Sequence, residues 1–66
     1  MEVTVNGAAR IVEASADIAA LIRALGLEGK RIAVERNGEI VPKSRYGDTR
    51  VLAGDKLEIV AAIGGG

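Results

Sequence analysis

One segment of this chain has the apolar periodicity of an amphipathic helix, and it constrains the fold more than any other feature. Ser15 is placed to cap its start, Asp17 puts a negative charge in the first turn, and Gly26 follows where a left-handed residue commonly ends a helix. The pattern therefore predicts a helix over residues 16–25 with one fully apolar face. That face contains the residues spaced at i, i+3, i+4 and i+7, namely Ile18, Leu21, Ile22 and Leu25.

Segments on both sides of this helix alternate between apolar and polar residues, which is the period of a half-buried strand. Residues 6–7 and 37–38 are Asn-Gly dipeptides, which suit the positive φ angles of tight hairpin turns. Residues 53–55 form another predicted turn, and residues 44–49 are polar and turn-rich. The predicted strands cover residues 1–5, 10–13, 32–35, 40–41 and 56–60.

The predicted element order is strand, strand, helix, strand, short strand and final strand. A single amphipathic helix needs one apolar surface to cover, and a mixed sheet with one apolar face provides it in two layers. This order fits the α+β architecture called β-grasp, or ubiquitin-like, in which a mixed sheet of four to five strands is covered by one main helix. The first and last strands are then expected to lie side by side and parallel in the sheet centre. We assign residues 1–63 to this domain and residues 64–66 to a flexible C-terminal tail.

The composition disfavours several classes of function. The 66 residues suffice for one small domain, and its core must be aliphatic because Tyr46 is the sole aromatic residue. Nine basic and nine acidic residues give no net field for binding nucleic acid. The chain has no cysteine or histidine, so it lacks the usual thiolate nucleophile, neutral-pH acid-base group and soft metal ligands. With no long apolar run, we expect a soluble, cytoplasmic protein that binds no metal, nucleic acid or membrane.

The final residues Gly64, Gly65 and Gly66 follow an apolar stretch and have no side chains. Glycine contributes little to a regular element, but residues without Cβ atoms can pass through a channel too narrow for side chains. Three extended residues would move a terminal carboxylate outward by roughly 10 Å. We interpret this segment as a chemical handle. A frayed terminus or a linker remnant is the alternative explanation for a chain that ends in glycines.

Three motifs occur in a fixed order: Asn-Gly-Glu-Ile-Val-Pro-Lys-Ser at residues 37–44, Gly-Asp-Lys-Leu-Glu-Ile-Val at residues 54–60, and Ile-Gly-Gly-Gly at residues 63–66. In this combination, and in length and element order, the whole chain closely resembles the ThiS-type sulfur-carrier proteins of bacterial thiamine biosynthesis. The resemblance implies that an ATP-dependent, ThiF-like activating enzyme adenylates the Gly66 carboxylate. A persulfide sulfur donor then converts it to a thiocarboxylate, which delivers sulfur to a ThiG-like thiazole synthase.

Under this resemblance the chain is a carrier and not an enzyme, and it binds no cofactor because ATP is used by the activating enzyme. Gly66 reacts, while Gly64 and Gly65 let the tail thread the active-site channel of the partner. By alternation, Val60 and Ala33 are expected to point away from the core, and the resemblance suggests that this sheet face contacts the partner. The basic residues that could assist recognition are Lys43, Arg45 and Arg50.

Several alternatives stay open on the sequence alone. The small carrier of molybdopterin synthesis shares the fold, the diglycine end and the activation chemistry, but it usually runs longer and has prolines where residues 61–63 are Ala-Ala-Ile. A carrier for transfer-RNA thiolation or protein conjugation would use the same activated carboxylate. A ubiquitin-like interaction module with an inert tail would bind partners without acyl chemistry. A stand-alone enzyme is disfavoured because histidine and cysteine are absent.

Overall fold

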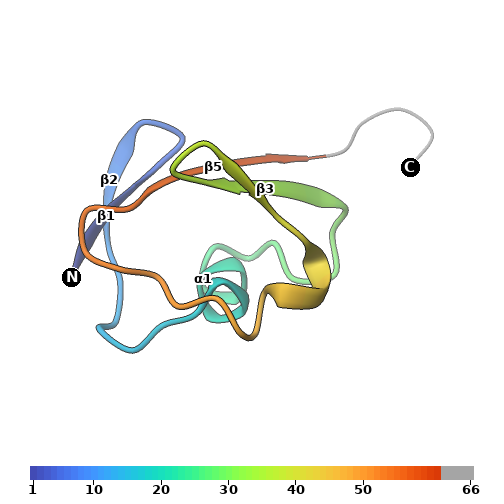
Figure 1. Ribbon diagram of the computed structural model, residues 1–66, viewed down its shortest axis with the longest axis horizontal. Coiled ribbons are helices and arrows are strands. Elements are labelled where there is room, and N and C mark those ends of the chain that lie inside the picture. Colours follow the sequence, from blue (N-terminus) through green and yellow to red (C-terminus); the bar gives the residue numbers. More distant parts are fainter. Residues whose placement is uncertain (62–66) are drawn as a thin grey trace.

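The computed structural model describes residues 1–61, and its elements follow the predicted order (Figure 1). Residues 62–66, which include the predicted tail at 64–66, lie outside the described residues. A short 3-10 helix, η1, follows the fourth strand. The elements are β1 (Glu2–Val5), β2 (Ala8–Ile11), α1 (Ile18–Ala24), β3 (Ile32–Arg36), β4 (Glu39–Val41), η1 (Lys43–Arg45) and β5 (Lys56–Ala61).

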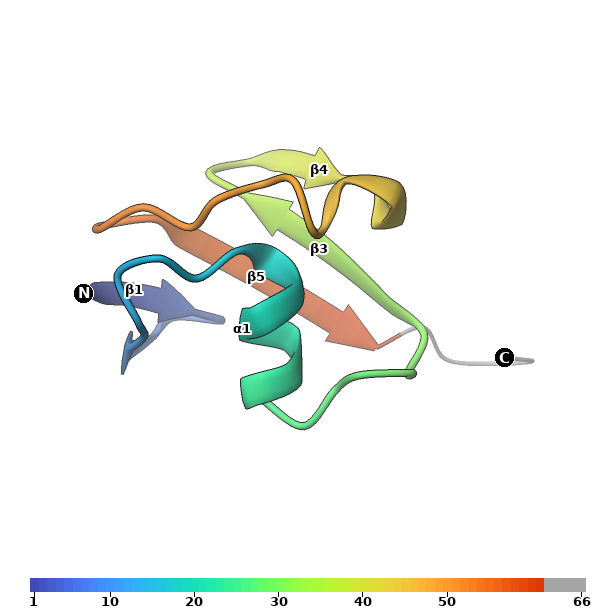
Figure 2. The same ribbon diagram turned by 90° about the horizontal axis from the view of Figure 1, so that it is seen from below.

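The five strands form one mixed sheet in the order β2-β1-β5-β3-β4. β1 and β5 are parallel neighbours, and the other neighbouring pairs are antiparallel. Helix α1 lies across one face of the sheet, and β5 runs through the middle of the molecule (Figure 2). The predicted β-grasp architecture, with its parallel first and last strands, is therefore confirmed.

The core lies between α1 and the covered face of the sheet. Helix residues at the predicted spacing point inward, and alternate residues of the strands meet them. Val51 joins this core from the segment before β5 and is fully buried. Removing one aliphatic side chain of this size from water contributes about 1.5–3 kcal/mol, so this packing is the main source of stability. The buried apolar residues are Val3, Val5, Ile18, Leu21, Ile22, Val34, Val41, Val51, Leu57 and Ile59.

The prediction of Ser15 as the helix N-cap is wrong. Helix α1 begins at Ile18, and Asp17 caps it by accepting a hydrogen bond from a backbone amide of the first turn at 2.7 Å. Asp17 has extended backbone angles and forms an isolated β-bridge with Arg50. Because this pairing with a distant segment keeps the chain extended, the helix starts only after it. Gly26 has a φ of 75° just beyond the helix, as predicted.

Strand β2 also differs from its predicted position. It begins at Ala8, directly after the turn formed by Asn6 and Gly7, and not at Arg10. Asn6 and Gly7 have φ angles of 52° and 84°, which suit a tight turn whose flanking residues Val5 and Ala8 are paired. All four residues of β2 are exposed at the sheet edge. An exposed edge strand has little apolar alternation, which explains the shifted prediction.

A buried aspartate joins the start of β5 to the turn between β3 and β4. Asp55 is 5% exposed, and its carboxylate accepts hydrogen bonds from Arg36 Nε at 2.7 Å and from Asn37 Nδ2 at 3.1 Å. The backbone amide of Leu52 donates a third hydrogen bond at 2.8 Å. The Asn37 side chain in turn accepts from the Lys56 amide at 2.9 Å. This network fixes the position of β5 against the β3–β4 hairpin.

The pKa of Asp55 is lowered in the folded protein. Burial alone would raise this pKa, but the hydrogen bonds from Arg36, Leu52 and Asn37 and the positive charge of Arg36 favour the ionised carboxylate more strongly. Because the folded-state pKa is depressed, the carboxylate stabilises the fold at pH values above the unfolded-state pKa of about 3.9. This stabilisation is lost as the pH falls through the folded-state pKa.

Replacing Asp55 with alanine should leave Arg36 and two amide donors without their acceptor. We expect Asp55→Ala to lower the free energy of unfolding by about 2–4 kcal/mol near neutral pH. The difference from the wild type should shrink as the pH falls from about 5 to 2, because the wild-type carboxylate is then protonated. Urea unfolding at a series of pH values measures both effects. Asp48→Ala, in an exposed turn, is the control, and an equal loss in both variants would contradict this role of Asp55.

Candidate functional site

No described element covers the face of the sheet opposite α1, which we call the open face (Figure 1). The two residues predicted to contact a partner lie there, because Ala33 in β3 and Val60 in β5 are directly opposite each other in the antiparallel register. Both are exposed, and Val60 is 62% accessible to solvent. The structure therefore brings Ala33 and Val60 together in a small apolar area. Their contact with a partner stays a prediction.

Ile40 is a further exposed apolar residue of the open face, which the sequence pattern had not singled out, and it lines a separate groove with Arg45. It lies in β4 opposite Glu35 of β3, on the same face as Ala33. Its exposure of 65% is high for a large aliphatic side chain within a strand. A signal was available in the sequence: once Val41 is assigned to the core, alternation directs its neighbour Ile40 outward.

Two acidic residues occupy directly opposite positions in the middle of the open face. Glu35 in β3 and Glu58 in β5 are directly opposite in the register, next to the pair of Ala33 and Val60. Like charges at directly opposite positions destabilise a sheet, so we expect this arrangement to lower the stability of the free protein. Sequence analysis assigned no role to individual carboxylates, because only the register shows that these two meet.

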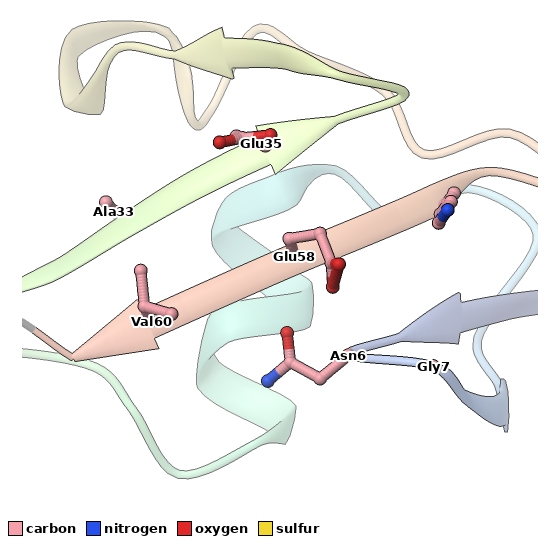
Figure 3. A pocket seen from close by; sticks show the side chains of 7 residues that line it. Asn6, Gly7, Ala33, Glu35, Glu58 and Val60 are labelled. Carbon is pink, nitrogen blue, oxygen red and sulfur yellow. The ribbon is translucent and has the colours of Figure 1, made fainter.

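These side chains line an open hollow on the sheet (Figure 3). Ala33 and Val60 form its apolar end, and the two glutamates make its middle acidic. The turn between β1 and β2 forms the rim beside β5. Lys56 adds a positive charge at the end of the hollow opposite Val60, so the lining carries two negative charges and one positive charge beside its apolar end. An apolar partner surface with arginine or lysine placed at the glutamates would match this distribution of charge. The lining residues are Asn6, Gly7, Ala33, Glu35, Lys56, Glu58 and Val60.

The three basic residues named as aids to recognition do not gather around this hollow. Lys43 and Arg45 belong to η1, and the backbone of Arg50 forms the isolated β-bridge with Asp17 before α1. Lys43 lines a separate groove that also includes Tyr46 and residues of α1. Arg45 lines a groove with Ile40, but the described structure joins none of the three cations to the hollow that contains Ala33 and Val60.

Strand β5 leads toward the predicted reactive end of the chain. Its last residue, Ala61, is paired with Ile32 of β3, so the sheet supports β5 up to this point. Val60 of the open face directly precedes Ala61, so the apolar area lies next to the start of the C-terminal segment. The glycines with predicted chemical roles lie outside the described residues, and their roles stay predictions. They are Gly64, Gly65 and Gly66.

Three further observations apply to residues 1–61. None of their helices is long and apolar enough to cross a membrane. Within this range, no group of three or more His, Cys, Asp or Glu side chains is placed to hold a metal ion. Every buried side-chain nitrogen or oxygen described in this range has a hydrogen-bond partner, so the polar groups of the interior are used to hold the fold.

Within residues 1–61, the sheet order and the one helix that covers the sheet define a β-grasp domain of the ubiquitin-like class. Residues 3–66 match the ThiS family, which is nearly the whole chain. This chain belongs to the ThiS family, as its motifs predicted.

Two solved structures show the same relationship. The crystal structure of the thiamine biosynthesis protein ThiS from Geobacter metallireducens is similar over the whole of both chains, with a TM-score of 0.86 and 33% sequence identity. The solution NMR structure of a thiamine biosynthesis protein from the same organism has a TM-score of 0.80 and 33% identity. That similarity covers all of this chain and 88% of the other.

Curated relatives include two much longer proteins. The thiazole synthases of Paramagnetospirillum magneticum and Magnetococcus marinus are 53% and 35% identical to this chain over all 66 residues. The chain spans 20% of the length of each of these relatives. The sulfur carrier protein ThiS of Bacillus subtilis is 44% identical over 46 residues, which is 70% of either chain.

Proposed function

We propose that this chain is a sulfur carrier of thiamine biosynthesis. Its Gly66 carboxylate is adenylated and then converted to a thiocarboxylate, which donates sulfur for thiazole formation. The observation that supports this most is the match of residues 3–66 to the ThiS family, because it includes the three C-terminal glycines. The fold adds support, since the central strand β5 ends shortly before these glycines.

Activation is needed because a carboxylate is a poor acceptor for a sulfur nucleophile. The C-terminal carboxylate is ionised at neutral pH and attacks the α-phosphate of ATP. The bond to pyrophosphate breaks, and an acyl adenylate forms. The terminal sulfur of a persulfide then attacks the carbonyl carbon and displaces AMP. A thiol then attacks the donor sulfur of this acyl disulfide, so that a new disulfide forms and the thiocarboxylate is left on Gly66.

This chemistry requires partner proteins, since the chain has no cysteine or histidine. A ThiF-like activating enzyme binds ATP, a separate protein supplies persulfide sulfur, and a ThiG-like thiazole synthase accepts the sulfur. The carrier is a co-substrate that binds no cofactor of its own, and its proposed place of action is the cytoplasm. Gly64 and Gly65 give access to the active site because they have no Cβ atoms.

The open face is the proposed docking surface for the activating enzyme. Ala33, Ile40 and Val60 supply an exposed apolar area, and Glu35 and Glu58 supply negative charge beside it. A partner with an apolar patch next to arginine or lysine would neutralise the two carboxylates that repel each other in the free carrier. Docking at this face would also place the partner at the root of the C-terminal segment.

The choice of acceptor rests on the two related thiazole synthases. In each of them, a segment similar to this entire chain makes up 20% of the protein. When a carrier and the enzyme that it supplies are joined in one chain, the carrier is present at a high effective concentration near the acceptor site of that enzyme. The similarity therefore favours thiazole synthase over a molybdopterin-type acceptor.

Intact-mass spectrometry tests the proposed chemistry. We expect the protein, incubated with ATP, a ThiF-like enzyme and a persulfide source, to gain the mass difference between one sulfur and one oxygen atom. A variant that lacks Gly66 and a variant extended beyond Gly66 should show no such gain, because the reacting carboxylate is displaced. An unchanged wild-type mass, in a mixture that loads a known carrier, would instead support an inert ubiquitin-like module.

Gly65→Val tests the need for a tail without side chains. We expect adenylation to slow about a hundredfold, because the added side chain misplaces the carboxylate in the partner's channel. The unfolding midpoint should not change. Gly47→Val is the matched control, since a Cβ at Gly47 meets no atom within 4 Å. A normal rate of AMP formation with Gly65→Val would contradict the threading role.

Glu58→Gln separates docking from stability. Removing one of two opposed charges should raise the free energy of unfolding of the free carrier by about 0.2–1 kcal/mol, and high salt should reduce the gain. The same change should weaken binding to the activating enzyme about threefold to tenfold. Glu2→Gln is the control, because Glu2 is opposite Ile11 and not another acid. Tighter binding by Glu58→Gln, measured by titration, would exclude a cationic docking partner.

A further inference from the structure

Strand β5 is longer than the strand that runs parallel to it. β1 pairs with β5 only through Thr4 with Lys56 and Val5 with Leu57, whereas β5 continues to Ala61. On its other side, β5 is paired with β3 as far as Ala61. Among the described residues, one edge of β5 is therefore left without a strand partner beyond Leu57.

On that edge, the side chain of Asn6 makes the next pair of ladder hydrogen bonds, which we call a rung, in place of a strand backbone. The Asn6 amide donates to Leu57 O at 2.8 Å, which ends the backbone pairing. Asn6 Nδ2 then donates to Ile59 O at 2.9 Å, and Asn6 Oδ1 accepts from the Ile59 amide at 2.7 Å. The carboxamide thus imitates one peptide unit of a strand. The chain turns away at Asn6, which has a φ of 52°, so the imitation extends for one rung only.

The following rung belongs to Ala61. Peptide groups alternate in direction along a strand, and both Leu57 and Ile59 direct theirs to the β1 side. Ala61 must therefore direct its N–H and C=O to the same side. Within residues 1–61, no backbone pairing to Ala61 is found on that side, and Ala61 is exposed. Figure 3 shows no strand beside β5 past Asn6.

This open rung is short, but neither a charged residue nor proline blunts it. Natural edges are often protected by such residues, whereas residues 60–61 are valine and alanine. An N–H and a C=O spaced as in a strand are matched by an extended backbone, which offers the complementary groups at the same spacing. This chemistry points to an extended polypeptide as the occupant and not to a small ligand.

We propose that an extended segment of the activating enzyme pairs with β5 at Ala61. It would lie on the same side of β5 as β1, beyond the point where β1 ends at Asn6. This inference rests on the proposed sulfur-carrier function. Asn6 defines where the added segment starts, because its side chain fills the preceding rung. The added segment lies beside Val60 of the open face and fixes the direction of the chain toward Gly66 before adenylation.

Ala61→Pro removes the one N–H that points to the open edge. It removes no hydrogen bond to β3, because Ala61 and Ile32 form a pair whose peptide groups face away from each other. Ala61→Val keeps the N–H and is the matched control. We expect the dissociation constant for the activating enzyme to rise about tenfold in Ala61→Pro and to stay within about twofold in Ala61→Val. Equal affinities of the two folded variants would overturn the inference.

Hydrogen exchange on the wild-type protein gives a second measurement that does not depend on how the proline variant folds. The Ala61 amide should exchange about tenfold more slowly, or slower still, in the complex with the activating enzyme than in the free carrier. The Ile59 amide, which Asn6 already binds, should be protected in both states and serves as the internal control. Unchanged exchange at Ala61 on binding would overturn the inference.

Different results would overturn the sulfur-carrier function and the added strand at Ala61. A wild-type protein that gains a thiocarboxylate while Ala61 shows neither effect keeps the sulfur-carrier function and excludes the added strand. A wild-type protein that binds no activating enzyme and gains no sulfur overturns both the function and the inference.

Discussion

Strand β5 lies between β1 and β3, and the burial of its inward side chains under α1 joins the two halves of the chain. Both Asn-Gly turns are anchored on this strand. Asn37 Oδ1 accepts from the Lys56 amide, and Asn6 Oδ1 accepts from the Ile59 amide. Each asparagine adopts the positive φ that its turn needs and bonds the neighbouring strand with its side chain. The position of β5 is therefore fixed near both ends by side chains as well as by backbone pairing.

The two faces of the sheet obey different physical requirements. The covered face is apolar and packs against α1, which gives the small domain its stability. On the open face, Ile40 and Val60 are exposed, and Glu35 and Glu58 lie at directly opposite positions, an arrangement of like charges that is unfavourable in a sheet. Features that lower the stability of the free protein are expected where it binds something else. The proposed carrier function accounts for them, since a partner would cover the apolar area and neutralise the acids.

Periodicity and turn residues predicted the helix, the strands and their order, because these depend on neighbours in the sequence. The predicted cap at Ser15 was wrong because Asp17 pairs with Arg50, a contact between segments far apart along the chain. The start of β2 was misplaced because an exposed edge strand has no clear alternation. The opposition of Glu35 and Glu58 could not be predicted either. It depends on the register between β3 and β5, which are separated along the chain by β4, η1 and a loop.

The sequence by itself determined the family, the β-grasp class and the position of the glycine-rich end, because motif order and apolar periodicity are local properties. Only the tertiary structure decided that Ile40, Glu35 and Glu58 share the open face with Ala33 and Val60, and which rung of β5 stays open. The bond between Asn6 and Ile59 joins positions 53 residues apart, and no local pattern specifies such a pairing. It follows from the register of the sheet, and that register is selected when α1 packs on alternate strand residues, because a slip of one residue would expose them.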